Sequence, residues 1–254
     1  MDHYIEFREV TKAFDDHLVL DRVSFTVDPG ETCVIMGRSG VGKSVTLKHI
    51  LGFLKPDSGR VIVAGQDITD WTEQQLVQIR RRVTMVFQSG ALFDSLTVEE
   101  NIAFPLESRS ETEAPEKIDA TVKELMKELE VADFADCLPS DLSTGAKRAV
   151  AIARALAEDP DAILYDEPTT MVDPLMAAHI SDLITKLKAR LKKTSIVVTH
   201  DTHLAKKLAD RILFLQEGRV GFFGTWQELE NSKEPFLRNF LAQDELIPAL
   251  DAGE

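Results

Sequence analysis

The chain of 254 residues is short of basic residues and cysteine, and it has no long apolar run. Lysine and arginine number 29 against 43 aspartates and glutamates, which gives a formal net charge of -14. This balance argues against a nucleic-acid protein, which needs a basic face to neutralise phosphates. No stretch approaches the roughly 20 apolar residues that span a bilayer. We therefore expect any membrane role to come through a partner.

Only two cysteines, Cys33 and Cys137, are present, and they lie far apart in the sequence. Such a pair in a chain of this length does not make a disulfide framework and fits a reducing cytosol. Cys33 lies in an apolar run and is predicted to be a small buried side chain. The first residues have neither the basic nor the apolar region of a signal peptide. The densest basic run, residues 80–82, is expected to be a solvated or ion-paired end of an element.

Strand-like and helix-like segments alternate along most of the chain. Residues 32–36, 162–165 and 195–199 are short apolar runs, the last two followed by polar residues. Runs of this kind are typical of buried parallel strands with active residues at their carboxyl ends. Residues 107–117 are polar and predict a loop, whereas residues 118–129 show one apolar helical face. The pattern predicts an α/β fold with right-handed crossovers.

A glycine-rich segment between a predicted strand and a predicted helix matches G-x-x-x-x-G-K-[ST]. Its glycines let backbone N–H groups turn toward phosphate oxygens, and the following helix points its positive dipole end at them. Lys43 is placed for the β- and γ-phosphates and the Ser44 hydroxyl for Mg²⁺. The motif alone does not separate a GTPase, a kinase, a helicase and a transport ATPase. The predicted ATP-binding residues in this segment are Gly37, Arg38, Ser39, Gly40, Val41, Gly42, Lys43, Ser44 and Val45.

Two carboxylates end another apolar strand, and two further polar residues follow strands of the same kind. In a P-loop fold, Asp166 would face the Mg²⁺ that Ser44 binds. Glu167 is placed to polarise the attacking water as a general base. His200 is a candidate contact to the γ-phosphate, and the Gln88 amide is a candidate ligand of the metal and the water. Alone, a strand-end histidine is more often structural, and Gln88 alone would mean nothing.

Together these positions resemble the nucleotide-binding subunit of ABC transporters, over nearly the whole chain. The resemblance implies an aromatic that stacks on adenine, a glutamine that couples the nucleotide to a membrane subunit, a signature segment, a D-loop and a switch histidine. ATP and Mg²⁺ follow as cofactors. The matching residues are Phe14, Gln88, Ser143 and Gly145 in the signature (142–145), Asp166 and Glu167, the D-loop (170–173), and His200.

The resemblance also implies a domain organisation and an assembly. The expected fold is α/β: a P-loop ABC ATPase core of residues 1–88 and 158–240, with an N-terminal antiparallel β subdomain. An inserted α-helical subdomain is expected at residues 89–157 and a tail at 241–254. In the family two such subunits close head to tail, and each ATP lies between the phosphate loop of one and the signature of the other. A homodimer is expected, with a different ATPase as the alternative second subunit.

A narrower resemblance lies in residues 88–98, 101–106 and 210–240. These segments are similar to the ATPases of phospholipid transporters that work with MCE-domain proteins. This implies an integral membrane permease, an MCE-domain protein and a small STAS-type accessory protein as partners, at the cytoplasmic face of the inner membrane. A transporter for another substrate is the alternative. The lipid would not touch this subunit, so its identity does not follow from the chemistry of these residues.

The signature departs from the family pattern at Thr144, where glycine is usual, and at Ala149, where arginine is common. Met171 and Val45 are further departures. A β-branched residue is strained where φ is positive, and the methyl of Thr144 would also crowd a γ-phosphate. We expect reduced but real hydrolysis, because Glu167 argues against a switch that only binds ATP.

A soluble ABC protein that acts on ribosomes or DNA would be a different class of protein. Such proteins usually carry two such domains or a coiled-coil insertion, and neither feature is found in this sequence. The acidic net charge also disfavours a nucleic-acid partner. At the end of the chain, the acidic tail at residues 243–254 is expected to be a frayed terminus, and a partner-docking segment is less favoured.

Overall fold

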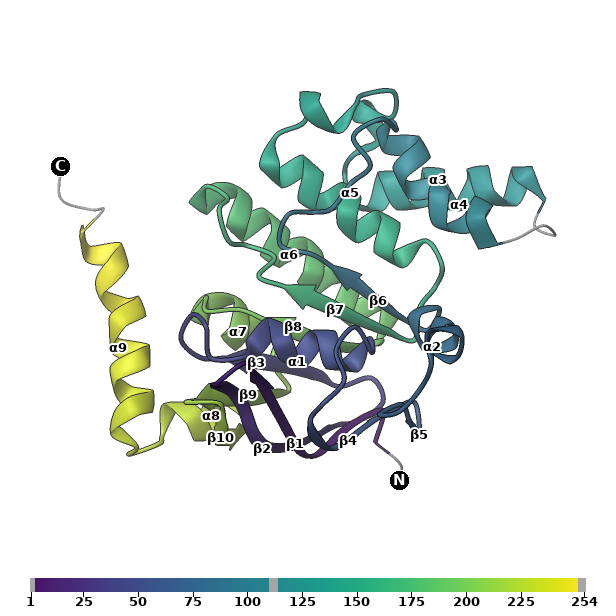
Figure 1. Ribbon diagram of the computed structural model, residues 1–254. Coiled ribbons are helices and arrows are strands. Elements are labelled where there is room, and N and C mark those ends of the chain that lie inside the picture. Colours follow the sequence, from purple (N-terminus) through teal and green to yellow (C-terminus); the bar gives the residue numbers. More distant parts are fainter. Residues whose placement is uncertain (1–2, 110–113, 251–254) are drawn as a thin grey trace. The chain divides into compact units, whose positions relative to one another are not determined.

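The computed structural model describes residues 3–109 and 114–250 (Figure 1). The chain divides into two compact units. Unit 1 comprises the residues up to Asp70 and those from Ile196 onward, and unit 2 comprises Trp71–Ser195. The predicted subdomain bounds, 1–88 with 158–240 and 89–157, follow a different criterion and stay predictions.

Unit 1 contains a four-stranded antiparallel sheet made, in spatial order, of β2 (His17–Val27), β1 (Ile5–Phe14), β4 (Ser58–Val63) and β5 (Gln66–Asp67). Phe7 and Phe25 stack in its core with ring centroids 4.7 Å apart. Gly59 has a φ of 87°, and a Cβ there would lie 2.3 Å from the carbonyl oxygen of Glu9. β1 and β4 therefore need glycine at this position, where their antiparallel pairing shifts register between Arg8 and Thr11.

The second group of strands in unit 1 consists of β3 (Thr32–Met36), β9 (Arg211–Gln216), β10 (Arg219–Gly224) and the end of β8 (Thr194–Val198). β9 pairs in parallel with β3 and antiparallel with β10. Every residue of β3 and β8 is buried, which confirms the predicted apolar strands. The helices of this unit are α1 (Lys43–Ile50), α7 (Thr202–Leu208), α8 (Trp226–Glu230) and α9 (Pro235–Leu250).

Unit 2 pairs the parallel strands β6 (Val83–Val86) and β7 (Ala162–Asp166) and is otherwise mostly helical. Its helices are α2 (Glu73–Arg80), α3 (Val98–Arg109), α4 (Pro115–Glu128), α5 (Thr144–Leu156) and α6 (Pro174–Leu191). α5 packs against α3, α4 and α6, and Figure 1 shows α3, α4 and α5 gathered in one helical group. Short 3-10 helices at Ala132–Phe134 and Pro139–Asp141 connect α4 to α5.

The predicted loop at residues 107–117 is wrong at both of its ends. α3 continues to Arg109, and α4 begins at Pro115. Polar residues at 107 and 108 lie on an exposed helical face, and proline favours the first turn of a helix. Residues 110–113 lie outside the described residues. The predicted apolar face of the following helix is confirmed, because Val122 and Met126 are buried on α4.

The basic run and the cysteines behave as expected. Arg80 pairs with Glu73 at 2.8 Å and Arg82 with Asp161 at 2.6 Å, so charge pairing accounts for much of the run. Cys33 is fully buried, which raises the pKa of its thiol, and Cys137 is a half-buried free cysteine. Among the described residues, no helix is long and apolar enough to cross a membrane. The predicted tail at 243–254 begins inside α9, and residues 251–254 lie outside the described part.

Candidate nucleotide site

The phosphate loop joins β3 to α1 in unit 1. Gly37, Gly40 and Gly42 have φ values of 144°, 80° and 109°. A Cβ at Gly37 would lie 2.5 Å from the carbonyl oxygen of Leu215, whereas a Cβ at Gly40 would meet nothing within 4 Å. The loop is thus packed against β9 at its start and open at Gly40. This is the shape that a bound phosphate requires, because its oxygens must approach backbone N–H groups closely.

Lys43 is the first residue of α1 and is almost fully buried. Its Nζ donates to the carbonyl oxygens of Gly37, at 2.9 Å, and Arg38, at 3.2 Å. The first turn of α1 has no acidic residue, so the positive end of the helix dipole is not neutralised locally. An ammonium group and a helix N-terminus on one loop fit the negative charge of a nucleotide's phosphates. Ser44 follows on the first turn of the same helix and is half-buried.

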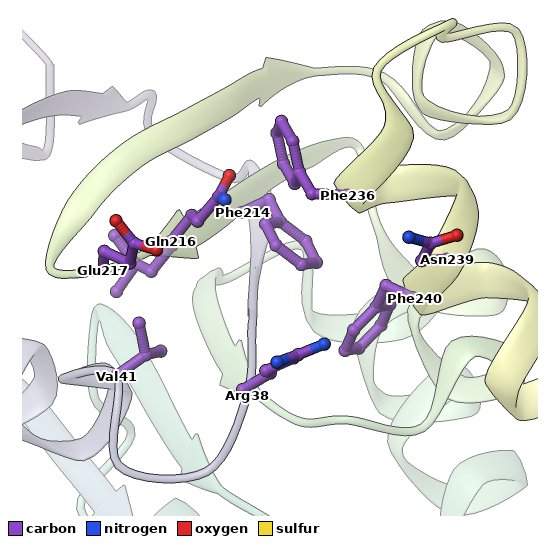
Figure 2. Close-up of a pocket in the computed structure, with 9 residues that line it drawn as sticks. Arg38, Val41, Phe214, Gln216, Glu217, Phe236, Asn239 and Phe240 are labelled. Carbon is purple, nitrogen blue, oxygen red and sulfur yellow. The ribbon is translucent and has the colours of Figure 1, made fainter.

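The flank of the phosphate loop lines a pocket of about 200 Å³ together with the C-terminal helix α9. Figure 2 shows Arg38 reaching toward the ring of Phe240, with Phe214 and Phe236 on another side of the pocket. Phe214 contacts both rings of α9, at centroid distances of 5.7 Å to Phe236 and 4.9 Å to Phe240. The C-terminal helix therefore packs on β9 beside the phosphate loop.

Unit 1 also holds Phe14, the candidate for stacking on adenine. Phe14 ends β1 and is 41% exposed, and Lys12 Nζ lies 5.5 Å from its ring centroid. Lys12 pairs with Asp57 at 2.7 Å. Hydrogen bonds from the Ala13 N–H and from Lys12 hold the pKa of Asp57 below its usual value. The ring is therefore fixed beside a charged pair and is partly open to solvent.

His200 follows β8 in unit 1 and is exposed. Two hydrogen bonds fix the backbone around it. The Asp201 N–H donates to Thr199 Oγ1 at 3.1 Å, and the Asp201 carboxylate accepts from the Leu204 N–H at 3.0 Å as the N-cap of α7. The predicted switch histidine thus lies on a hydrogen-bonded turn between a buried strand and a capped helix.

The predicted catalytic carboxylates lie at the end of β7 in unit 2. Asp166 is its last residue and is 9% exposed. Glu167 has a φ of 48°, in a region that non-glycine residues rarely occupy. Thr170 Oγ1 donates to Glu167 Oε2 at 2.9 Å. Gln88, also in unit 2, is exposed beyond the end of β6.

The signature segment begins α5 in unit 2. Ser143 is its N-cap, and its Oγ accepts from the Ala146 N–H at 3.2 Å. Gly145 is buried under a methionine, since Met176 Cε lies 2.1 Å from where a Cβ of Gly145 would stand. Sequence reasoning missed Met176, because no sequence motif marks a methionine that covers a glycine.

The condition under which Thr144 would be strained, a positive φ, is not met. Thr144 is the first residue of α5 and does not have a positive φ, so a β-branched residue is tolerated there. The crowding of a γ-phosphate by its methyl stays a prediction. We expect a Thr144→Gly variant to turn over ATP about 2- to 5-fold faster, corresponding to about 0.4–1 kcal/mol of relieved crowding. Unchanged steady-state turnover would show that Thr144 does not restrain hydrolysis.

The predicted site residues thus form two sets, one in each unit. Unit 1 carries the nucleotide-binding set and unit 2 the carboxylates and the signature. Among the described residues, no cluster of three or more His, Cys, Asp or Glu is built to hold a metal ion. The first set consists of Phe14, residues 37–45 and His200, and the second of Gln88, Ser143, Gly145, Asp166 and Glu167.

Comparison with known proteins agrees with this chemistry. The family model described as ABC transporter matches residues 20–170. The intermembrane phospholipid transport system ATP-binding protein MlaF of Escherichia coli K12 is 34% identical, over 93% of this chain and 88% of that protein. MlaF of Haemophilus influenzae is 37% identical, over 93% and 89%. A probable ribonucleotide transport ATP-binding protein, mkl of Mycobacterium tuberculosis, is 35% identical, over 93% of this chain and 66% of that protein.

Solved structures show the same fold. The ATP-binding cassette MJ0796, a dimer in a post-hydrolysis state with ADP and Pi, is 34% identical with a TM-score of 0.79. The alignment covers 87% of this chain and 98% of the MJ0796 chain. The chain cbiO1 of Clostridium perfringens, part of the transporter complex cbiONQ, has a TM-score of 0.82 at 27% identity and covers 99% and 100%. This chain belongs to the ABC transporter family as an ATP-binding and ATP-hydrolysing subunit with an α/β P-loop fold.

Proposed function

We propose that this subunit hydrolyses ATP to drive a membrane permease that moves phospholipid together with an MCE-domain protein. The observation that supports phospholipid as the cargo is the similarity to MlaF proteins over 93% of the chain, because those proteins are named for phospholipid transport. The relatives named for ribonucleotide transport have a similar identity, 35%, over 66% of their own length, and they favour a second cargo class, nucleotides. A small STAS-type protein completes the proposed assembly at the cytoplasmic face of the inner membrane.

The site residues divide the chemistry of phosphoryl transfer among them. Lys43 and the N–H groups of the phosphate loop stabilise negative charge on the transferred phosphoryl group. Ser44, Gln88 and Asp166 would hold Mg²⁺, which would neutralise charge on the phosphates. Glu167 accepts the proton of the attacking water, and His200 keeps that water in place. Phe14 stacks on adenine.

The second half of the site comes from another subunit. Ser143 and Gly145 lie at the N-terminus of α5, where N–H groups and the helix dipole favour a phosphate. In this proposal they serve the ATP of the opposite subunit in a homodimer. The dimeric structures of MJ0796 support this arrangement. A pairing with a different ATPase is the alternative.

A groove of about 420 Å³ in unit 2 is the proposed docking surface for the permease. Its wall carries Phe93 and Phe104, which are 43% and 40% exposed and have ring centroids 4.6 Å apart. Arg154 lies over the Phe93 ring and donates to the carbonyl oxygen of Ala91 at 2.9 Å. Two adjacent exposed aromatic rings braced by a cation are suited to an amphipathic helix of a partner. Two residues that line the groove, Phe87 and Ala91, lie on either side of Gln88 in the sequence, and Gln88 is the residue expected to couple the nucleotide to the membrane subunit.

A Phe104→Glu variant is expected to bind the permease much more weakly, because binding would remove the new carboxylate from water in the groove. We expect the fraction of the chain that co-purifies with solubilised membrane complex to fall at least 10-fold. Phe134→Glu is the matched control, since Phe134 is also 40% exposed in unit 2 but does not line the groove. Equal retention of both variants would reject this docking surface.

The cargo is tested by reconstituting the co-purified complex in vesicles that contain a fluorescent phospholipid. ATP-dependent transfer of the lipid, lost in a complex that carries Glu167→Gln, would support the proposal. ATP-dependent uptake of a labelled nucleotide without lipid transfer would instead favour the second cargo class.

A further inference from the structure

Arg148 is a buried cation on α5 that pairs with no carboxylate among the described residues. It is 4% exposed, and burial lowers the pKa of its guanidinium. Nη1 donates to the carbonyl oxygen of Phe87 at 3.0 Å, and Nη2 donates to that of Thr170 at 3.4 Å. Burying a charge is costly, so a group held this way in the interior needs a reason. Here the guanidinium is held by two backbone carbonyls from two separate loops.

Each of these carbonyls belongs to a segment next to a site residue. Phe87 directly precedes Gln88, and Thr170 begins the D-loop three residues after Glu167. Thr170 is also bonded to that glutamate twice. Its Oγ1 donates to Glu167 Oε2 at 2.9 Å, and its N–H donates to the Glu167 carbonyl oxygen at 3.3 Å. A chain of hydrogen bonds therefore runs from the signature helix through Thr170 to the predicted general base, entirely within unit 2.

The backbone conformation at Glu167 requires support from hydrogen bonds of this kind. Its φ of 48° is unfavourable for a residue with a side chain, and Met171 in the same turn has a φ of 62°. Local preferences thus do not hold this turn in place, and surrounding contacts must do so. A guanidinium is suited to this task, because its planar fork directs several N–H groups at once. A lysine ammonium on a flexible stem would not hold two separate carbonyls in one fixed geometry.

We propose that Arg148 is a positioning residue for hydrolysis, which ties the Gln88 segment and the D-loop to the signature helix and, through Thr170, orients the Glu167 carboxylate. This inference rests on the proposed role of Glu167 as the general base. It also assigns a role to Thr170, whose hydroxyl donates a hydrogen bond to one oxygen of the Glu167 carboxylate and so fixes the rotamer of the Glu167 side chain. Misplacing a catalytic group by about 1 Å can cost about 100-fold in rate.

The test measures ATP binding and steady-state turnover in the co-purified complex for Arg148→Lys, Thr170→Val, Thr170→Ser and the double variant Arg148→Lys/Thr170→Val. We expect kcat to fall about 10-fold or more in Arg148→Lys and in Thr170→Val, while KM and the Kd for a fluorescent ATP analogue change less than about 3-fold. Thr170→Ser keeps the hydroxyl and is expected to retain most of the activity. Arg190→Lys on the exposed part of α6 is the matched control.

The double variant distinguishes positioning from general support of the fold. If Arg148 acts through Thr170, the double variant should be little slower than the slower single variant, because neighbouring sites in one network are not additive. The proposal would be overturned if the fold-losses in kcat of the two single variants multiplied in the double variant. It would also be overturned by a loss of ATP affinity that parallels the loss of kcat. If Arg148→Lys fails to fold, an unchanged kcat in Thr170→Val alone would overturn it.

Failure of this inference and failure of the proposed function give different results. If Glu167→Gln retains turnover, Glu167 is not the base, and the proposed mechanism itself is wrong. If Glu167→Gln is inactive but Thr170→Val is fully active, only the positioning role falls.

Discussion

Replacement of Glu167 by glutamine is expected to lower ATP turnover about 100-fold or more while ATP remains bound. General-base catalysis contributes roughly 100- to 10,000-fold to an enzymatic rate, and an amide cannot take up a proton at neutral pH. The side chain keeps its size, and its amide oxygen can still accept from Thr170 Oγ1, so the turn after β7 should survive. Steady-state phosphate release and equilibrium ATP binding, measured side by side, check both parts.

Glu130→Gln is the matched control for this variant. Glu130 is also in unit 2, has a φ of 58° and is exposed, so the charge change and the backbone type are the same. Its turnover should equal that of the unmodified chain. If the two variants behave alike, Glu167 has no special role. If the unmodified chain itself does not hydrolyse ATP, the assay is repeated on the co-purified membrane complex, in which we propose that a second subunit completes each site.

Asn101→Asp is expected to destabilise unit 2 by about 3 kcal/mol. Asn101 is completely buried on α3 and makes four hydrogen bonds to the preceding loop. The two hydrogens of its amide nitrogen are shared among the carbonyl oxygens of Phe93 at 3.1 Å, Leu96 at 3.0 Å and Thr97 at 2.9 Å, and its Oδ1 accepts from the Phe93 N–H at 2.9 Å. A carboxylate has no proton to donate, so it would face three carbonyl oxygens in a buried place.

Urea unfolding of the purified chain measures this effect, and Asp94→Asn is its control. Asp94 is exposed in the same loop, so the reverse exchange there should change the free energy of unfolding by less than about 0.5 kcal/mol. A loss below about 1 kcal/mol for Asn101→Asp would contradict the role given to the Asn101 amide. Because this loop carries Phe93, we also expect the variant to bind the permease less well.

The sequence predicted best the elements whose environment is uniform. The strands at residues 32–36, 162–165 and 195–199 were located to within one residue, since a strand buried on both faces consists mostly of apolar residues. The phosphate loop was equally clear, because its glycines and Lys43 have no common alternative use in that order. Residues 107–109 were assigned to a loop because the exposed face of a helix has the same composition as a loop.

The parts that escaped prediction depend on contacts between distant segments. Arg148 looks like any exposed arginine in the sequence, yet its guanidinium is bonded to carbonyls 61 and 22 residues away. The packing of Met176 over Gly145 is likewise a contact between residues that lie apart in the sequence. Backbone carbonyls carry no sequence signal, so partners of this type cannot be read from residue identities. Whether Thr144 has a positive φ could not be predicted for a related reason, because the residue at which α5 begins was not known from the sequence.

The difference between the two thiols makes this protein easy to label. Cys33 is fully buried and its raised pKa keeps it protonated, so it should not react with maleimides while the chain is folded. Cys137 is partly accessible, and its carbonyl oxygen accepts from the Val98 N–H at 2.9 Å, at the start of the helix that carries Phe104. We therefore expect a maleimide fluorophore to react at Cys137 alone in the unmodified sequence, and its emission to change when the proposed permease binds.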